Sequence, residues 1–366
     1  MRIASALTSF PFPAPIPSSN QSQLLMHTHL LRLSLLAAAL SSLASCSSMR
    51  SPVLPGAKPK DHGLIGAGEG PAWKDGSLLF TDGKHINRMD PQGRTTVFRN
   101  NGSNGLLFDR EGRLVACESA LRRVTRTEKD GSITVLADRF EGKRFNTPND
   151  LCMDSKGYIY FTDPRYGPRD GMEIVEHEIR IKSPNAGNKT RYVEGVYRIN
   201  REAKLPPGLC SYAYDIPNVT RINCDGAERP NGILITPDDK HLYICDNNNN
   251  TRGGSRKLLR YSLDKNGDVK PGSRKVIFDW QDSRGPDGMK MDAAGRLYVA
   301  AGTNKVTKWE TNRFKAGCYI LSPGGRLIDF IPTAPDEATN CALVNEDWKR
   351  TLFITSGNHL WSVPLR

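Results

Sequence analysis

The sequence predicts an all-β protein, a six-bladed β-propeller with four-stranded blades. One pattern occurs six times: a polar residue, a short apolar strand, a turn with Gly or Asp, and a second apolar strand. Further strand pairs with their own turn signals lie between these repeats, so that each unit can supply four strands. The 33 Gly and 24 Pro residues also favour short strands joined by turns. Because the repetition is even, we favour a propeller over an array of β-sandwiches.

Each repeat is predicted to be two strands around a hairpin turn. In chain order the repeats read EGPAWKDGSLLFTD, NGLLFDREGRLVACE, NDLCMDSKGYIYFTD, NGILITPDDKHLYICD, DGMKMDAAGRLYVAA and NCALVNEDWKRTLFITS. Only GNHLWSVPLR follows the last repeat, and this segment is too short to complete a blade. We therefore expect a strand from residues 52–68 to complete that blade and to close the ring, which removes free sheet edges.

The residues before the propeller domain, which we place at 63–366, have the pattern of an export signal. Residues 1–25 resemble a wrongly extended start, and residues 26–45 a signal peptide with a basic beginning and an apolar run too short for a permanent membrane span. Leu43-Ala44-Ser45-Cys46 resembles the bacterial lipobox, and an ordinary cleaved signal is the alternative. We expect an exported periplasmic or cell-envelope lipoprotein, attached to the membrane only through Cys46, with residues 46–62 as a linker.

Composition excludes several other classes of protein. The formal net charge of +12 is scattered, without a dense basic block, so we expect no nucleic-acid partner. Seven cysteines follow Cys46, and their odd number and the absence of a C-x-x-C pair argue against a disulfide framework or a zinc knuckle. Most lie in apolar strand runs, and only Cys210 and Cys224 form a plausible pair.

The polar residue that opens each repeat predicts a functional site. The innermost strand of every propeller blade starts on the same face, so these residues should surround one opening of the central channel. Asn and Asp also suit turns, which would explain one or two of the positions. Glu is not a turn former, and an oxygen-bearing side chain stands at all six positions. We call them the ring residues: Glu69, Asn104, Asn149, Asn231, Asp287 and Asn340.

Oxygen ligands without His or Cys select hard cations, chiefly Ca²⁺, with Mg²⁺ or Mn²⁺ possible and Zn²⁺ less natural. The carboxylates of Glu69 and Asp287 would balance a divalent charge. The sequence contains no G-x-S-x-G elbow, H-E-x-x-H or P-loop motif. We therefore predict metal-assisted hydrolysis of a strained cyclic ester, in which the cation polarises the carbonyl and a carboxylate activates water.

At these residues the sequence resembles the gluconolactonase/regucalcin family of lactonases, from about residue 63 onward. The resemblance rests on EGPAW, NGLLFDREGRLVACES, FEGKRFNTPNDLCMDSKGYIYFTDPRYG, RPNGILITPDDKHLYICDN and GPDGMKMDAAGRLYVA, in the family's order. It implies a calcium-dependent carboxylic-ester hydrolase that opens a sugar lactone, such as glucono-1,5-lactone, to the aldonic acid. It also implies that Glu69, Asn149, Asn231 and Asp287 bind the metal, and that Asp287 activates the attacking water.

For substrate binding we predict contacts from Asn104, Glu118, Asn149, Tyr166 and Asn340. Animal relatives have an Arg two residues before the counterpart of Asn149, where this chain has Thr147, and Arg144 could substitute for it. A metal-stabilised propeller that binds a saccharide or an envelope partner without catalysis is the alternative function.

Two further predictions concern the surroundings of the ring. The insertion at 168–194 is either a lid or a solvated excursion. Asp82, Asp163 and Asp246 each end the second strand of a repeat, where we expect structural hydrogen bonds on the face away from the ring residues.

Overall fold

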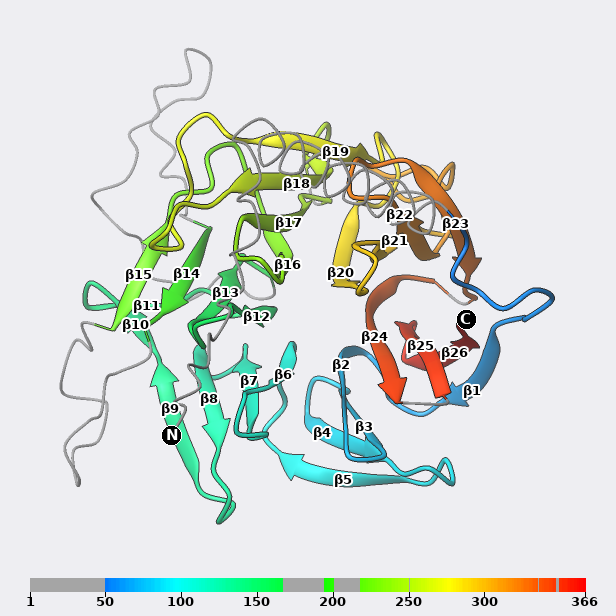
Figure 1. Cartoon of the computed structure of the whole chain (residues 1–366), viewed down its shortest axis with the longest axis horizontal. Coiled ribbons are helices and arrows are strands. Elements are labelled where there is room, and N and C mark those ends of the chain that lie inside the picture. The colour runs from blue at the N-terminus through cyan, green and yellow to red at the C-terminus, as the bar shows by residue number, and fades with distance from the viewer. Residues whose placement is uncertain (1–49, 167–193, 201–217, 250, 335, 347–348) are drawn as a thin grey trace, which may run out of the picture. The chain divides into compact units, whose positions relative to one another are not determined.

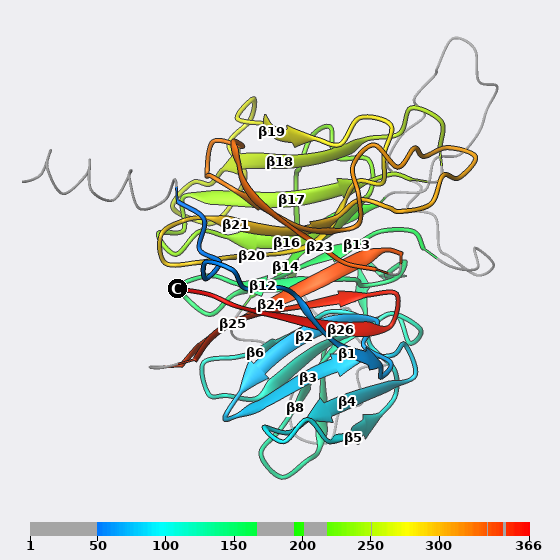
Figure 2. The same ribbon diagram turned by 90° about the vertical axis from the view of Figure 1, so that its right-hand side faces the viewer.

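Six four-stranded antiparallel sheets surround a central axis in the described part of the chain, and no helix occurs there (Figure 1). The structure is a computed structural model. It describes residues 50–166, 194–200, 218–249, 251–334, 336–346 and 349–366. The strands run between two faces, one at each end of the axis (Figure 2). The predicted six-bladed propeller is therefore confirmed.

The innermost strands, which carry or directly follow the ring residues, start the blades. Blade 1 contains β2 (Glu69–Lys74), β3 (Ser77–Thr81), β4 (His85–Met89) and β5 (Thr95–Asn100). Blade 2 contains β6 (Leu106–Phe108), β7 (Leu114–Glu118), β8 (Arg123–Thr127) and β9 (Ile133–Ala137). Blade 3 contains β12 (Leu151–Met153), β13 (Ile159–Asp163), β14 (Gly195–Ile199) and β15 (Val219–Ile222).

The remaining blades follow the same order from the axis outward. Blade 4 contains β16 (Pro230–Ile235), β17 (His241–Asn247), β18 (Arg256–Ser262) and β19 (Lys275–Asp279). Blade 5 contains β20 (Pro286–Met291), β21 (Leu297–Ala301), β22 (Gly317–Leu321) and β23 (Leu327–Pro332). Blade 6 contains β24 (Ala338–Glu346), β25 (Lys349–Ser356), β26 (His359–Pro364) and β1 (Lys60–Leu64). A short hairpin, β10 (Arg139–Phe140) with β11 (Lys143–Arg144), lies between blades 2 and 3 in sequence.

The first strand of the described residues, β1, completes the last blade, as predicted. Lys60 of β1 pairs with Ser362 of β26, and the two strands are antiparallel. An isolated bridge joins Val53 to Leu365 further along the same edge. The folded unit therefore begins before residue 63, the boundary expected from sequence, because part of the presumed linker supplies backbone hydrogen bonds to blade 6.

Apolar clusters between neighbouring blades hold the ring together. Leu78 and Phe80 of blade 1 are fully buried in one cluster with Ala342 and Phe353 of blade 6. Another cluster joins residues of blades 4 and 5 around the fully buried Trp280. Strands buried on both faces read as continuous apolar runs, which explains why β3, β17 and β21 lack a strict alternation.

The aspartates at or beside the ends of the second strands lie at the same end as the ring residues, contrary to our expectation. The second strand runs antiparallel to the innermost one, so its end lies beside the start of that strand, and Asp246 pairs with Pro230. The expected structural role is confirmed. Asp246 accepts hydrogen bonds from the backbone N–H of Arg229, Asp163 from that of Asn146, and Asp82 from that of His85.

Six cysteines are unpaired in the described residues, namely Cys117, Cys152, Cys224, Cys245, Cys318 and Cys341. Cys210, the signal region and nearly all of the 168–194 insertion lie outside the described residues. None of the described elements is a helix with the length and apolar character needed to span a bilayer.

Candidate functional site

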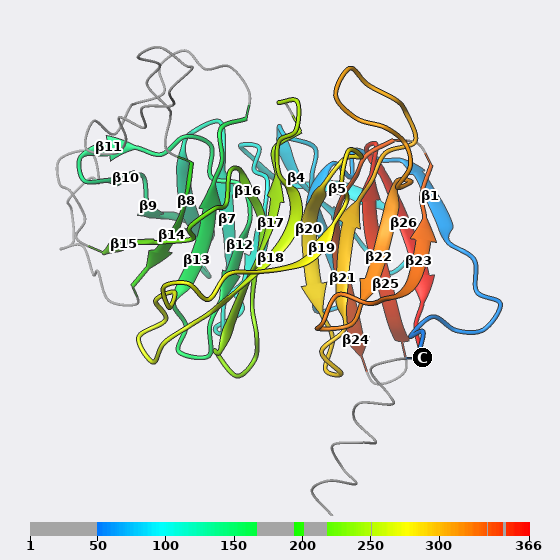
Figure 3. The ribbon, with the colours of Figure 1, turned by 90° about the horizontal axis from the view of Figure 1, so that it is seen from above.

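Five of the six ring residues line one cavity of about 440 Å³ at the end of the propeller axis. They come from five different blades: Glu69, Asn104, Asn149, Asn231 and Asp287. The cavity's end of the propeller can be found in Figure 3 by the loop between β21 and β22, which leaves the blades there. This end lies on the side opposite to the C-terminus. The repeat position therefore converges on one place, as the sequence predicted.

A glycine follows four of the ring residues, and its lack of a side chain lets neighbouring blades approach. A Cβ at Gly70 would lie 2.0 Å from the Asn104 carbonyl oxygen, and one at Gly232 would lie 2.2 Å from the Asp287 carbonyl oxygen. No side chain fits at such distances. The glycine of one blade thus allows the close approach of the ring residue in the next blade. Packing between blades therefore explains why a Gly follows these ring residues.

Glu69 and Asn231 are each oriented by a neighbour. The amide Nδ2 of Asn340 donates to Glu69 Oε2 at 3.1 Å, and the Gly70 N–H donates to the same oxygen at 3.1 Å. Asn231 Nδ2 donates to the Tyr166 hydroxyl at 3.2 Å, and this hydroxyl donates to the Asn247 carbonyl at 3.1 Å. These bonds leave Glu69 Oε1 and Asn231 Oδ1 available to a ligand.

Three ring oxygens are buried without a hydrogen-bond partner: Asn104 Oδ1, Asn149 Oδ1 and Asp287 Oδ1. Buried polar atoms normally have partners, so a cluster of unpartnered oxygens needs an explanation. Carboxylate and amide oxygens are ligands of hard cations such as Ca²⁺, and a cation between them would satisfy these atoms. Within the described residues no group of three or more His, Cys, Asp or Glu is placed to hold a metal. The ring offers two carboxylates with amides instead, and this donor set fits a hard cation.

Both carboxylates of the ring have raised pKa values. Burial raises the pKa of Asp287 to about 7; the Arg284 guanidinium opposes this shift, and the carboxylates of Glu337 and Asp150 add to it. Burial, with the negative charges of Asp287 and Asp150, also raises the pKa of Glu69. Carboxylates crowded in this way retain protons unless positive charge is placed between them.

Two predicted substrate contacts lie outside the cavity lining. Glu118, the last residue of β7, is fully buried and pairs with Arg99 at 2.9 Å and with Arg123 at 2.6 Å. Its carboxylate therefore joins β5, the outermost strand of blade 1, to β8, the third strand of blade 2. Asn340 is 1% exposed, and its amide holds Glu69, so it supports the site without lining it.

Asn104, Asn149 and Tyr166, the other predicted substrate contacts, do line the cavity. Arg144 does not: it lies on β11 and donates to the Leu121 carbonyl at 3.0 Å. Arg144 therefore does not take the place of an arginine at Thr147 in the lining of this cavity.

The sequence reasoning missed four lining residues: Ala120, Arg284, Glu337 and Thr339. Arg284 precedes Asp287 by three residues, and a search for charged residues beside the ring positions would have found it. Glu337 carries no comparable signal, because it reaches the cavity from the loop between β23 and β24.

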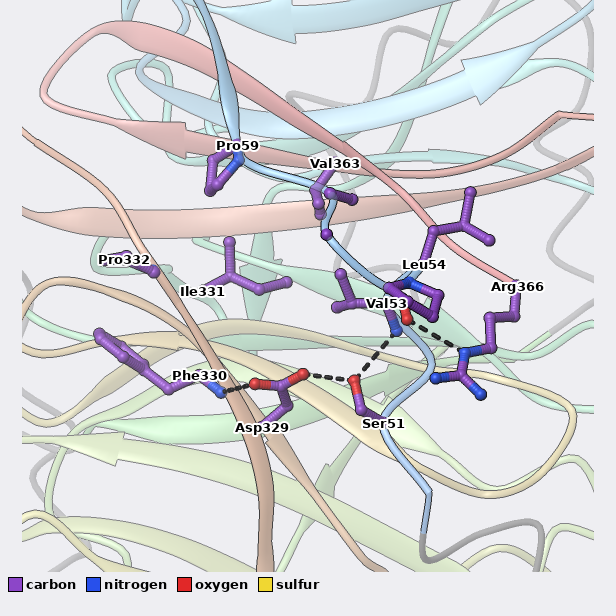
Figure 4. Close-up of a pocket in the computed structure, with 13 residues that line it drawn as sticks. Ser51, Val53, Leu54, Pro59, Asp329, Phe330, Ile331, Pro332, Val363 and Arg366 are labelled. Atoms are coloured by element: carbon purple, nitrogen blue, oxygen red, sulfur yellow. Dashed lines mark hydrogen bonds between the residues drawn. The ribbon is translucent and has the colours of Figure 1, made fainter.

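A second cavity, of about 370 Å³, lies at the outer edge of the propeller and contains no ring residue (Figure 4). It is enclosed by the segment 51–59, β23 and the end of β26. Ser51 Oγ donates to the Asp329 carboxylate, and Arg366 Nε donates to the Val53 carbonyl at 3.2 Å. These contacts fasten the N-terminal segment to blades 5 and 6, so the cavity is a product of ring closure.

Comparison with known proteins agrees with this geometry. The model of the SMP-30/gluconolactonase/LRE-like region matches residues 67–358. The chain belongs to the SMP-30/gluconolactonase/LRE-like family. The resemblance inferred from the repeat motifs is thereby confirmed.

Two proteins named as gluconolactonases are similar to the chain over most of its length. A gluconolactonase of Zymomonas mobilis is 28% identical over 318 residues, which are 80% of this chain and 76% of that protein. The structure of a gluconolactonase from Xanthomonas campestris has 27% identity and a TM-score of 0.64, covering 86% of this chain and 92% of the other. The structure of a calcium-binding regucalcin from Agrobacterium tumefaciens, at 16% identity and a TM-score of 0.57 over 83% and 92% of the two chains, shares the fold.

Proposed function

We propose that this protein hydrolyses a sugar-derived lactone to the corresponding hydroxy acid. The reaction takes place in the cavity of about 440 Å³ that the ring residues line, which we call the ring cavity. The observation that carries the proposal is the convergence of Glu69, Asn149, Asn231 and Asp287 from four blades on one cavity, with unpartnered oxygens among them. Membership of the family and the similarity to gluconolactonases support the same reaction class.

The four residues fit a divalent cation, Ca²⁺ by preference, which when bound supplies Lewis-acid polarisation of the lactone carbonyl. Asp287 then acts as the proton acceptor. It takes a proton from water while the water oxygen bonds to the carbonyl carbon. The bond between the carbonyl carbon and the endocyclic oxygen of the lactone breaks. Asp287 returns the proton to that departing oxygen. The products are one carboxylic acid and one hydroxyl group in the same molecule, so atoms balance.

The remaining lining suits a polyhydroxylated substrate. Asn104, Ser119, Thr147 and Thr339 place amide and hydroxyl groups around the cavity. A volume of about 440 Å³ lies within the range of small-molecule sites, about 300–1,000 Å³. Sugar hydroxyls both donate and accept hydrogen bonds, so they can donate to these hydroxyl oxygens and accept from the Asn104 amide. A lactone of a monosaccharide, such as glucono-1,5-lactone, is therefore the substrate that we propose.

A titration assay at constant pH tests the proposal. Protein treated with EDTA should lose hydrolysis of a panel of sugar lactones, and added Ca²⁺ should restore it. Asp287→Asn should lower kcat by about 10²-fold or more, because a general base contributes that much. Asp75→Asn, in the exposed turn between β2 and β3, is the matched control and should retain full activity. Acid release from none of the lactones, with Ca²⁺ present, would refute the proposed function.

A further inference from the structure

Arg284 is the only positively charged side chain among the described residues that line the ring cavity. It precedes β20, and its side chain is 14% exposed. Its Nη2 lies 3.7 Å from Asp287 Oδ2 and 3.2 Å from Glu337 Oε2. Its Nε is buried without a partner, so the guanidinium retains donors that these ion pairs do not use. The repeat pattern assigns this arginine no role.

Glu337 forms the shorter of the two ion pairs with Arg284, through the same Nη2 atom. It lies in the loop before β24, and its side chain is 52% exposed at the mouth of the cavity. Its φ of 65° is in the left-handed region, which a Glu residue occupies at an energetic cost. The Gly357 N–H donates to the Glu337 carbonyl at 3.1 Å and secures this conformation. The guanidinium is thus drawn toward the mouth and lies nearer to Glu337 than to Asp287.

The charge of the lining restricts what Arg284 can bind. The other charged residues of the cavity, Glu69, Asp287 and Glu337, are all acidic. Lactone hydrolysis turns an uncharged substrate into a carboxylate, so the product carries a negative charge that the substrate lacks. A guanidinium binds a carboxylate through two parallel N–H···O bonds, and few other side chains match that geometry.

We propose that Arg284 is the carboxylate-binding residue of this site, which takes the carboxylate of the hydroxy-acid product, and that Glu337 positions it away from Asp287. The inference depends on the proposed function, because only lactone opening generates this carboxylate at the cavity. Without Glu337, the guanidinium would move onto Asp287 and compete for the lone pair that accepts the proton from water.

Calorimetric titration with D-gluconate, in saturating Ca²⁺, tests the binding role, and D-glucitol serves as the uncharged probe of equal chain length. Arg284→Met should weaken gluconate binding by about tenfold or more, since hydrogen bonds to charged groups are among the stronger ones. Arg284→Lys keeps the positive charge but cannot form two parallel N–H···O bonds, so its affinity for gluconate should be intermediate. Glucitol binding should not change. Arg326→Met, in an exposed turn of the same blade, is the matched control. Unchanged gluconate affinity in Arg284→Met would overturn the assignment.

Ca²⁺ affinity provides a readout that a merely structural role does not predict. Arg284→Met removes a positive charge 3.7 Å from Asp287 Oδ2, so it should bind Ca²⁺ several-fold more tightly than the wild type. If Arg284 only supported the local fold, the same variant would bind Ca²⁺ more weakly and unfold at a lower temperature. That result would count against the proposal.

The positioning role of Glu337 is tested with a double-mutant cycle. Glu337→Gln should lower kcat in the wild-type background, because Arg284 then pairs with Asp287. In the Arg284→Met background the same substitution should have little effect on kcat. Equal effects in both backgrounds would show that Glu337 does not act through Arg284.

The outcomes separate this inference from the proposed function. If the wild type hydrolyses lactones and Arg284→Met binds gluconate normally, the inference fails and the proposed function stands. If the wild type neither hydrolyses a lactone nor binds gluconate with Ca²⁺ present, the proposed function fails, and the inference fails with it.

Discussion

Asn340 donates a hydrogen bond of 3.1 Å to the Glu69 carboxylate, although the two residues are 271 positions apart in the chain. Asn340 belongs to β24 in blade 6, and Glu69 opens β2 in blade 1. The bond therefore crosses the place where the ring closes. It links the closure of the propeller to the orientation of a proposed metal ligand.

Asn340→Ala should weaken Ca²⁺ binding by about tenfold, because the carboxylate loses a side-chain donor that orients it. The substitution leaves Glu69 in place, so calorimetry should detect weaker binding and not its abolition. Asn345→Ala, at the other end of the same strand, serves as the control. Unaltered Ca²⁺ affinity in Asn340→Ala would show that the Gly70 N–H alone orients Glu69.

Gly232→Ala should destabilise the protein by about 1–3 kcal/mol, the usual cost of overpacking. Its Cβ would lie 2.2 Å from the Asp287 carbonyl oxygen, which must move. Because that backbone belongs to a ring residue, Ca²⁺ affinity should fall as well. Gly324→Ala is the control, since the nearest atom to its Cβ is 4.0 Å away. Chemical denaturation and calorimetry measure the two effects, and a Gly232→Ala protein with normal stability would contradict the packing argument.

In metal-free protein, Asp287 should make the folded state less stable as pH rises. The pKa of this carboxyl is about 7 in the folded protein, against an ordinary value of 3.8. Between these values the folded state retains a proton that the unfolded state has released, so the stability from this group is lost as pH approaches 7. Asp287→Asn should therefore melt at a higher temperature than the wild type in EDTA at pH 8, with a smaller difference at pH 4.

Added Ca²⁺ should reverse that order, since the cation binds the deprotonated carboxylates. The gain in melting temperature on adding Ca²⁺ should be larger at pH 8 than at pH 5 in the wild type. It should be small at both pH values in Asp287→Asn. An equal gain at the two pH values would indicate that the ring carboxylates do not bind the ion.

We also propose that the protein is exported and anchored through a lipid at Cys46. Cys46→Ser should then move the protein from the membrane fraction to the soluble fraction of the cell envelope. Ser47→Ala is the adjacent control and should leave the distribution unchanged. Immunoblots of the two fractions measure the outcome, and a Cys46→Ser protein that stays with the membrane would contradict the lipobox interpretation.

The sequence by itself determined the architecture and the location of the site. Strand pairing within a blade is local, and alternating apolar segments around Gly and Asp turns specify it over a few tens of residues. A motif that returns in every blade must return at one place on the axis. For this reason Glu69, Asn231 and Asp287 could be predicted to lie together before any contact was known.

Only the tertiary structure decided which side chains complete the cavity. Arg284 and Glu337 belong to loops of different blades, and their ion pair exists because the closed ring places those loops at one mouth. Glu118 stands one position before a lining residue, yet it pairs with Arg99 of blade 1 and Arg123 of blade 2. Such outcomes depend on contacts between strands and blades distant in sequence, and a local pattern of hydrophobicity and turns does not encode them.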